Sequence, residues 1–169
     1  DSAGVVYTVS AGDEPGAIKG LYDFADAMGF EILALGKGKN NPLDREATPE
    51  TLLEKAQAQN INPRMLTSFV DATNTMIEMT AVSNATGFLP SQRGLMGPTS
   101  TLKDLPKLFS LKEQGGILDR YKIVEYVLGI APGVFAVITS DKPIIQQGMS
   151  YVSMGEGPNY VLFRPYHLD

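Results

Sequence analysis

Apolar and amphipathic segments alternate along the first part of the chain. Residues 5–9 and 30–35 are short and mostly apolar, which predicts two buried strands. Between them, apolar residues recur at positions 18, 21, 22, 25 and 28, a spacing that predicts an amphipathic helix. Two strands joined through a helix form a β-α-β unit, in which the strands normally lie parallel with a right-handed crossover.

The middle of the chain is predicted to be mainly helical. The Thr-Pro-Glu-Thr segment at 48–51 is typical of a helix start and predicts a helix over about 49–59. Residues 65–70 are compatible with strand or helix, and we expect them to be extended, followed by a helix over about 72–86. One face of that helix is predicted to carry Met76, Ile77, Thr80, Ala81 and Asn84.

The last part of the chain is predicted to contain three strands and two helices. The strands cover 123–128, 134–138 and 160–163, and the helices cover about 103–109 and 141–153. Residues 88–101, with two prolines and two glycines, form the longest candidate for a functional loop. Together the pattern predicts one α/β (α+β) domain, in which a mixed sheet with flanking helices starts as β-α-β and continues with antiparallel strands.

Composition narrows the possible functions. A chain of 169 residues that is 43% hydrophobic and 20% charged fits a single domain with an apolar core. Fourteen basic against 19 acidic residues give a net charge of -5, which argues against nucleic-acid binding. The absence of cysteine excludes disulfides, thiolate metal sites and cysteine nucleophiles, and the single histidine, His167, argues against a Ser-His-Asp triad.

Targeting signals are also lacking. We see no signal peptide, and the longest near-apolar run, 126–138, is too short to span a bilayer, so we expect a cytoplasmic protein without membrane contact. The chain begins without methionine and ends abruptly, which suggests a piece of a larger protein.

The strongest candidate site is the segment Gly36-Lys37-Gly38-Lys39-Asn40, directly after the second predicted strand. Glycine lets the backbone turn sharply and approach a ligand closely. Ligands of open α/β sheets bind at the carboxyl ends of strands, where these lysines and amides would suit an anionic or polyhydroxy substrate. The alternative is an ordinary lysine-rich surface turn.

Asp71 is the second candidate, because it follows the segment 65–70. It is either a helix N-cap or a carboxylate that exchanges protons together with a lysine, since a partly desolvated lysine titrates closer to neutral pH. Glu78 lies two turns along the same helix face and is either a site residue or a solvated charge. Arg64 and Arg93 flank loops and either clamp a phosphate or are ordinary surface arginines.

Neither G-x-G-x-x-G nor G-x-x-x-x-G-K-[ST] occurs, so we assign no cofactor-binding residue to this chain. With a single histidine and no cysteine, we assign no metal ligand either.

Several segments taken together resemble one family. They are Ser10-Ala11-Gly12-Asp13-Glu14-Pro15, Gly36-Lys37-Gly38-Lys39-Asn40, Asn62-Pro63-Arg64-Met65 with Ser68-Phe69-Val70-Asp71, Asn84-Ala85-Thr86-Gly87 and Tyr166-His167-Leu168. The chain, over essentially its whole length, resembles the homoserine dehydrogenase-like oxidoreductases that include the deoxyxylulose phosphate reductoisomerase-like enzymes. The resemblance implies a catalytic and dimerising domain, preceded in the parent by a Rossmann domain that binds NAD or NADP and often followed by a SAF domain.

The resemblance also implies roles for individual residues. Lys39 and Asp71 match the catalytic lysine and aspartate, and Lys37 is a second candidate lysine. We expect Asn40, Asn74 and Asn84 to hold substrate hydroxyls, with Arg64, Glu78 and Arg93 as further substrate-binding residues. The implied substrate is a small hydroxy or keto compound (homoserine-like, a sugar acid or a sugar phosphate), and the isolated domain is expected to be inactive. The rival interpretation is a non-catalytic ligand-sensing or oligomerisation domain on the same scaffold.

Overall fold

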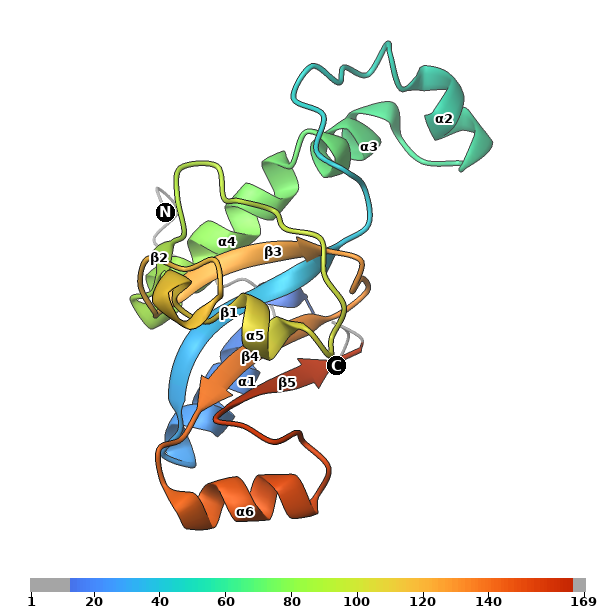
Figure 1. Ribbon diagram of the computed structural model, residues 1–169. Helices are drawn as coiled ribbons and strands as arrows, with labels where there is room; N and C mark the ends of the chain where they lie inside the picture. Colours follow the sequence, from blue (N-terminus) through green and yellow to red (C-terminus); the bar gives the residue numbers. More distant parts are fainter. Residues whose placement is uncertain (1–12, 166–169) are drawn as a thin grey trace, which may run out of the picture.

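The computed structural model describes residues 13–165, so the predicted strand at 5–9 lies outside the described residues. A mixed sheet of five strands, in the order β2-β3-β1-β4-β5, forms the centre of the molecule (Figure 1). Its strands are β1 (Glu31–Lys39), β2 (Leu89–Pro90), β3 (Ile123–Leu128), β4 (Val134–Thr139) and β5 (Asn159–Arg164). Because β1 pairs parallel with β3 and antiparallel with β4, the predicted α/β class with a mixed sheet is confirmed.

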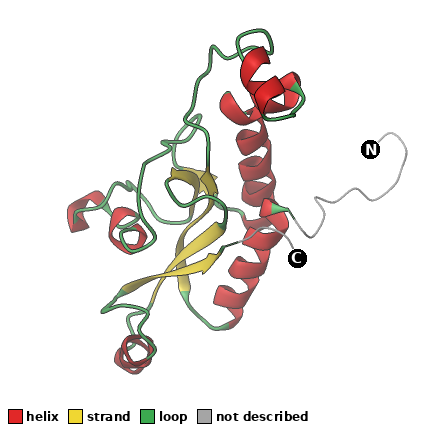
Figure 2. Ribbon diagram, turned by 90° about the vertical axis from the view of Figure 1, so that its right-hand side faces the viewer, coloured by secondary structure: helices red, strands yellow, loops and turns green. Residues whose placement is uncertain are grey.

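Helices cover the two faces of the sheet unequally. One face packs against α1 (Glu14–Ala27) and α4 (Thr73–Thr86), which Figure 2 shows along one side of the strands. The other face packs against α5 (Leu105–Leu108) and the loops around it, and the short 3-10 helix η1 (Lys112–Gln114) follows without a buried residue. None of the described helices is long and apolar enough to cross a membrane.

Two helical parts project from opposite ends of the sheet (Figure 1). The arm contains α2 (Leu53–Ala58) and α3 (Pro63–Val70) and has its own small apolar cluster around Ala56, Leu66 and Val70. At the other end lies α6 (Pro143–Tyr151), between β4 and β5. The arm therefore adjoins the end of β1 that carries the lysines, and α6 lies near its beginning.

The prediction of extended structure at 65–70 is wrong, because these residues belong to α3. The Asn62 side chain accepts hydrogen bonds from the backbone N–H groups of Arg64 and Met65, and Pro63 occupies the first turn. These are the features of a capped helix start. The helix predicted at 49–59 is shorter than expected, because Thr48 and Thr51 bond to each other in a turn before α2 begins.

The predicted turn at Gly36–Lys39 is also wrong, because β1 continues through both lysines. Gly36 lies opposite Glu125 of β3, and a Cβ placed on Gly36 would lie 1.9 Å from the Glu125 carbonyl oxygen. The Gly38 N–H donates to the Gly133 carbonyl at 2.8 Å. The two glycines therefore fit closely packed strands rather than a turn, and Lys37 and Lys39 lie on the same face of the sheet.

The helix predicted at 72–86 is α4, but the residues predicted to line one face of it do not form its buried face. The buried residues of α4 are Thr75, Glu78, Met79 and Val82, whereas Ile77 and Asn84 are exposed. The apolar pattern misled because a carboxylate, Glu78, occupies a buried position on this helix. Its burial depends on a partner from β1, Lys37.

Candidate functional site

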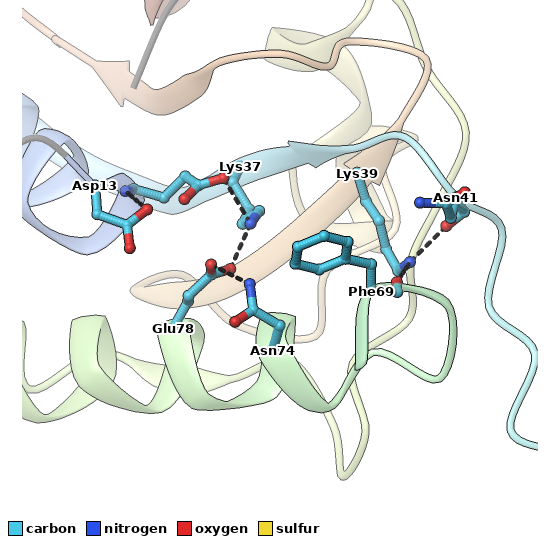
Figure 3. Close-up of polar contacts among 8 residues, drawn as sticks. Asp13, Lys37, Lys39, Asn41, Phe69, Asn74 and Glu78 are labelled. Carbon is cyan, nitrogen blue, oxygen red and sulfur yellow. Dashed lines mark hydrogen bonds and ion pairs between the residues drawn. The ribbon is translucent and has the colours of Figure 1, made fainter. Parts of the chain in front are cut away.

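The centre of the candidate site is a buried ion-pair cluster around Lys37 (Figure 3). The Lys37 ammonium donates to Glu14 Oε1 at 2.8 Å and to Glu78 Oε2. The other Glu78 oxygen, Oε1, accepts from the Asn74 side-chain amide. The cluster therefore joins β1, α1 and α4, and it explains how Glu78 is tolerated in the core: buried charges are normally paired and hydrogen-bonded.

The three carboxyl groups of this cluster have different affinities for protons. Burial raises the pKa of Glu14, but hydrogen bonds with Asp13 and Lys37 outweigh it and lower this pKa to about 2. The pKa of Asp13 is raised by its hydrogen bond with Glu14 and by burial. Burial also raises the pKa of Glu78, although the Lys37 charge acts in the opposite direction. A proton entering the cluster would therefore go to Asp13 or Glu78 rather than to Glu14.

A metal ion is one possible occupant of such a cluster. Carboxylate oxygens of Asp13, Glu14 and Glu78 all lie within 4.8 Å of one another, and hard divalent cations prefer oxygen ligands. However, the Lys37 ammonium already contacts two of the three carboxylates. In this arrangement the Lys37 ammonium occupies the position between the carboxylates, and a cation could enter only by displacing it.

The low pKa of Glu14 predicts how stability depends on pH. A carboxylate whose pKa falls on folding stabilises the folded state above its unfolded pKa, and this stabilisation is lost as the pH falls through the folded pKa. We therefore expect Glu14→Gln to be less stable than the wild type at pH 7, and the difference to shrink as the pH falls from 4.5 to about 2. Urea denaturation at a series of pH values measures it. Glu113→Gln, the same change at an exposed position, is the control, and a difference that stays constant with pH would contradict the prediction.

Lys39 lies two residues along β1 and is held in a different way. It is 5% exposed, and its ammonium donates to the backbone carbonyls of Asn41 and Phe69, each at 2.5 Å. Figure 3 shows the Phe69 ring between the two lysines. Burial lowers the pKa of Lys39, and the neighbouring Lys37 charge lowers it further, whereas Asp71 acts to raise it. Burial and the Lys37 charge thus favour the neutral amine of Lys39, whereas Asp71 favours its ammonium form.

Asp71 lies between α3 and α4 rather than at the end of a strand, so its predicted position is wrong. Its carboxylate accepts from the Thr73 N–H at 2.7 Å, but the N-cap residue of α4 is Ala72, so Asp71 lies one position before the cap. It nevertheless acts electrostatically on Lys39. The two residues are therefore neighbours in space, because the chain returns to the end of β1 after the arm.

The other predicted substrate-binding residues divide into two groups. Asn74 and Glu78 belong to the Lys37 cluster. The side chains of the remaining four are exposed; they are Asn40, Arg64, Asn84 and Arg93. Their roles remain predictions.

Sequence reasoning assigned Asp13 and Glu14 only to the start of a helix, and it assigned nothing to Glu125. The Glu125 carboxylate is fully buried and accepts from the Ser91 hydroxyl and from the N–H groups of Met96 and Gly97. It fixes the loop 91–97 to β3. The sequence did contain a signal for a buried carboxylate here, because Glu125 is the only charged residue in the apolar strand predicted at 123–128.

The loop 91–97 is close to the lysines. Gly97, with φ +62°, lies so near Tyr126 that a Cβ there would be 2.1 Å from the Tyr126 hydroxyl. Tyr126 is the register partner of Lys37 across the β1–β3 pair. The predicted functional loop thus borders the lysine site through this tyrosine.

A groove of about 1,400 Å³ lies elsewhere, at the other end of β1. It is bordered by Glu31 and Thr139, which pair where β1 begins, and by Lys107 and Asn159. Lys37 pairs with Val134 at the far end of the same two strands, so this groove is separate from the lysine site.

Comparison with known proteins supports a catalytic role for this domain. Residues 12–169 match the family described as oxidoreductase DRL, catalytic domain. No curated protein matches the chain. Because the family match covers nearly all of the sequence, including both lysines and the carboxylates around them, the chain belongs to the DRL oxidoreductases and comprises their catalytic domain.

Proposed function

We propose that this domain binds and converts the substrate of an NAD(P)-dependent oxidoreductase that acts on a small hydroxy or keto compound. The observation that carries the proposal is Lys39: a buried amine with a lowered pKa, beside Asp71 and the Lys37 cluster. Enzymes tune lysines toward neutral pH by burial and neighbouring charge when the lysine serves as an acid or base. The family match is to an oxidoreductase catalytic domain.

Lys39 has the donors that this role requires. A lysine ammonium has three N–H donors, and two of them bond to the carbonyls of Asn41 and Phe69. The third is available for a substrate oxygen. When an alcohol is oxidised, neutral Lys39 would accept the hydroxyl proton; in the reverse direction its ammonium would donate a proton to the carbonyl oxygen. Asp71 would stabilise the ammonium form, and the Lys37 charge would favour the neutral form.

The hydride carrier is proposed to be a nicotinamide bound by another domain of the parent protein. Nicotinamide would supply or accept the hydride when bound, whereas this chain's residues orient the substrate and move the proton. The start of α1 fits this division. Asp13 caps this helix and Glu14 pairs with Lys37, whereas a dinucleotide site would place a glycine-rich, phosphate-binding turn at such a helix start.

A binding measurement tests this division. We expect the isolated chain to bind neither NADH nor NADPH, because it lacks the glycine fingerprint. Calorimetry of the 169-residue chain with each dinucleotide measures it. Binding with a dissociation constant in the micromolar range would contradict the proposal that the cofactor site lies in another domain.

We also propose that the domain forms a homodimer.

The rival function, a non-catalytic sensing or oligomerisation domain, is favoured by one observation: the Lys39 contacts to two backbone carbonyls would equally tie the arm to the end of β1. Turnover of a Lys39 variant decides between them.

A further inference from the structure

Helix α6 stands apart from the rest of the domain. It is inserted between β4 and β5, which pair antiparallel as far as Thr139 and Asn159. Figures 1 and 2 show it projecting from the end of the sheet. No residue of the helix is buried. Its own packing therefore does not explain its apolar composition.

The orientation of α6 is set by contacts on one side. Met149 packs against the main apolar core, and the Gln146 side-chain amide donates to the Ser140 carbonyl at 2.7 Å. The opposite side carries Ile144, Tyr151 and Val152, which are 73%, 88% and 61% exposed. We call these three residues, together with Gly148, the α6 stripe, because they lie at i, i+4, i+7 and i+8.

The α6 stripe is uncharged as well as apolar. Residues 143–155 contain no Asp, Glu, Lys or Arg. A surface helix normally turns charged residues toward solvent, and an exposed apolar patch marks an interaction site. We propose that α6 pairs with α6 of a second copy of this chain, with the two helices antiparallel about a twofold axis that passes close to Gly148. This inference rests on the homodimer in the proposed function and specifies its surface.

Two features favour a second copy. A twofold contact requires a self-complementary surface, and an uncharged stripe with a glycine near its centre meets this requirement. A Cβ placed on Gly148 would meet nothing within 4 Å, so the backbone is open to close approach by another helix. Antiparallel pairing also brings Lys142, at the start of one helix, toward the end of the other, where Glu156 follows.

Other partners fit this surface less well. A lipid-binding helix carries several cations, whereas α6 has only Lys142 beside it and the chain has a net charge of -5. The cofactor domain proposed above would have to face the lysine site to exchange hydride with the substrate, and that site lies at the opposite end of β1 from α6. That domain is therefore not the expected occupant.

Cysteine cross-linking tests the twofold axis directly, because the chain contains no cysteine. Disulfides form only where the two Cβ atoms lie about 4 Å apart. We expect Gly148→Cys in the 169-residue chain to form a disulfide-linked dimer under mild oxidation. Thr80→Cys, at an exposed position of α4, is the control and should remain unlinked. Equal linking of both variants, or none at position 148, would overturn the assignment of the axis.

Sedimentation equilibrium tests the stripe as a whole. We expect the wild type to dimerise, and Ile144→Asp with Tyr151→Asp to raise the dissociation constant about 100-fold or more, because a buried charge would face the apolar partner. Ile77→Asp, at an exposed apolar residue of α4, should leave dimerisation unchanged. A dimer that the stripe variant does not weaken would overturn this inference and leave the proposed homodimer standing. A wild type that stays monomeric at high concentration would overturn both, whereas turnover of the parent tests the catalytic proposal separately.

Discussion

Replacing Lys39 by methionine in the full-length parent is expected to lower kcat by about 10²- to 10⁴-fold, the usual contribution of a general acid or base. Methionine retains most of the side-chain length and apolar volume but can neither accept nor donate the proton. Steady-state turnover, measured well below the melting temperature of the variant, gives the result. A folded Lys39→Met variant with near-normal turnover would instead support the rival, structural role for this lysine.

The same substitution is also expected to lower stability. Lys39 is buried in a strand rather than exposed on a loop, and it donates to two backbone carbonyls that methionine cannot satisfy. A buried acceptor without a partner costs about 1–3 kcal/mol. The test therefore compares the fall in kcat of Lys39→Met with its loss of stability, which is measured as the free energy of unfolding in urea.

Lys37→Met provides the contrast within the same strand. It would leave the Glu14 and Glu78 carboxylates together without the ammonium between them, and breaking a buried pair in this way costs about 3–5 kcal/mol. We expect Lys37→Met to destabilise the domain more than Lys39→Met does. Lys55→Met, at an exposed lysine on the arm, is the control and should change neither quantity appreciably.

Much of the fold follows from the pattern of apolar residues. The strands at 123–128, 134–138 and 160–163 and the first long helix appear in the structure with small shifts in their bounds. The segment 65–70 was wrongly predicted because a short apolar run is compatible with both strand and helix. The capping signal at Asn62-Pro63, just before it, was the better guide to its structure.

The candidate site was harder to predict, because it depends on contacts between distant residues. Glycine and lysine have low strand preference, so the end of β1 resembles a turn until its neighbours β3 and β4 are known. Lys37 and Glu78 are 41 positions apart, and nothing local indicates that they pair. The sequence could therefore identify Lys37, Lys39, Asp71 and Glu78 as candidates, but it could not show which carboxylates hold which lysine.

The largest effect on stability is expected from Gly36→Ala. The single added methyl group would lie 1.9 Å from the Glu125 carbonyl oxygen and 2.7 Å from the Phe135 ring. The oxygen belongs to the backbone of β3, so it cannot rotate away as a flexible side chain would. The strands β1 and β3 would have to separate at the centre of the sheet, next to both lysines.

We expect this change to cost more than the roughly 1–3 kcal/mol typical of overpacking, and so a large part of the roughly 5–15 kcal/mol that stabilises an ordinary domain. Urea denaturation followed by circular dichroism measures it. Gly20→Ala is the matched control: Gly20 lies inside α1, where a Cβ would meet nothing within 4 Å, so alanine should stabilise the domain by about 0.5–1 kcal/mol. The two variants make the same chemical change with opposite expected signs. A Gly36→Ala variant as stable as the wild type would mean that β1 and β3 do not pair closely at this glycine, and the placement of Lys37 and Lys39 on one buried face would then have to be abandoned.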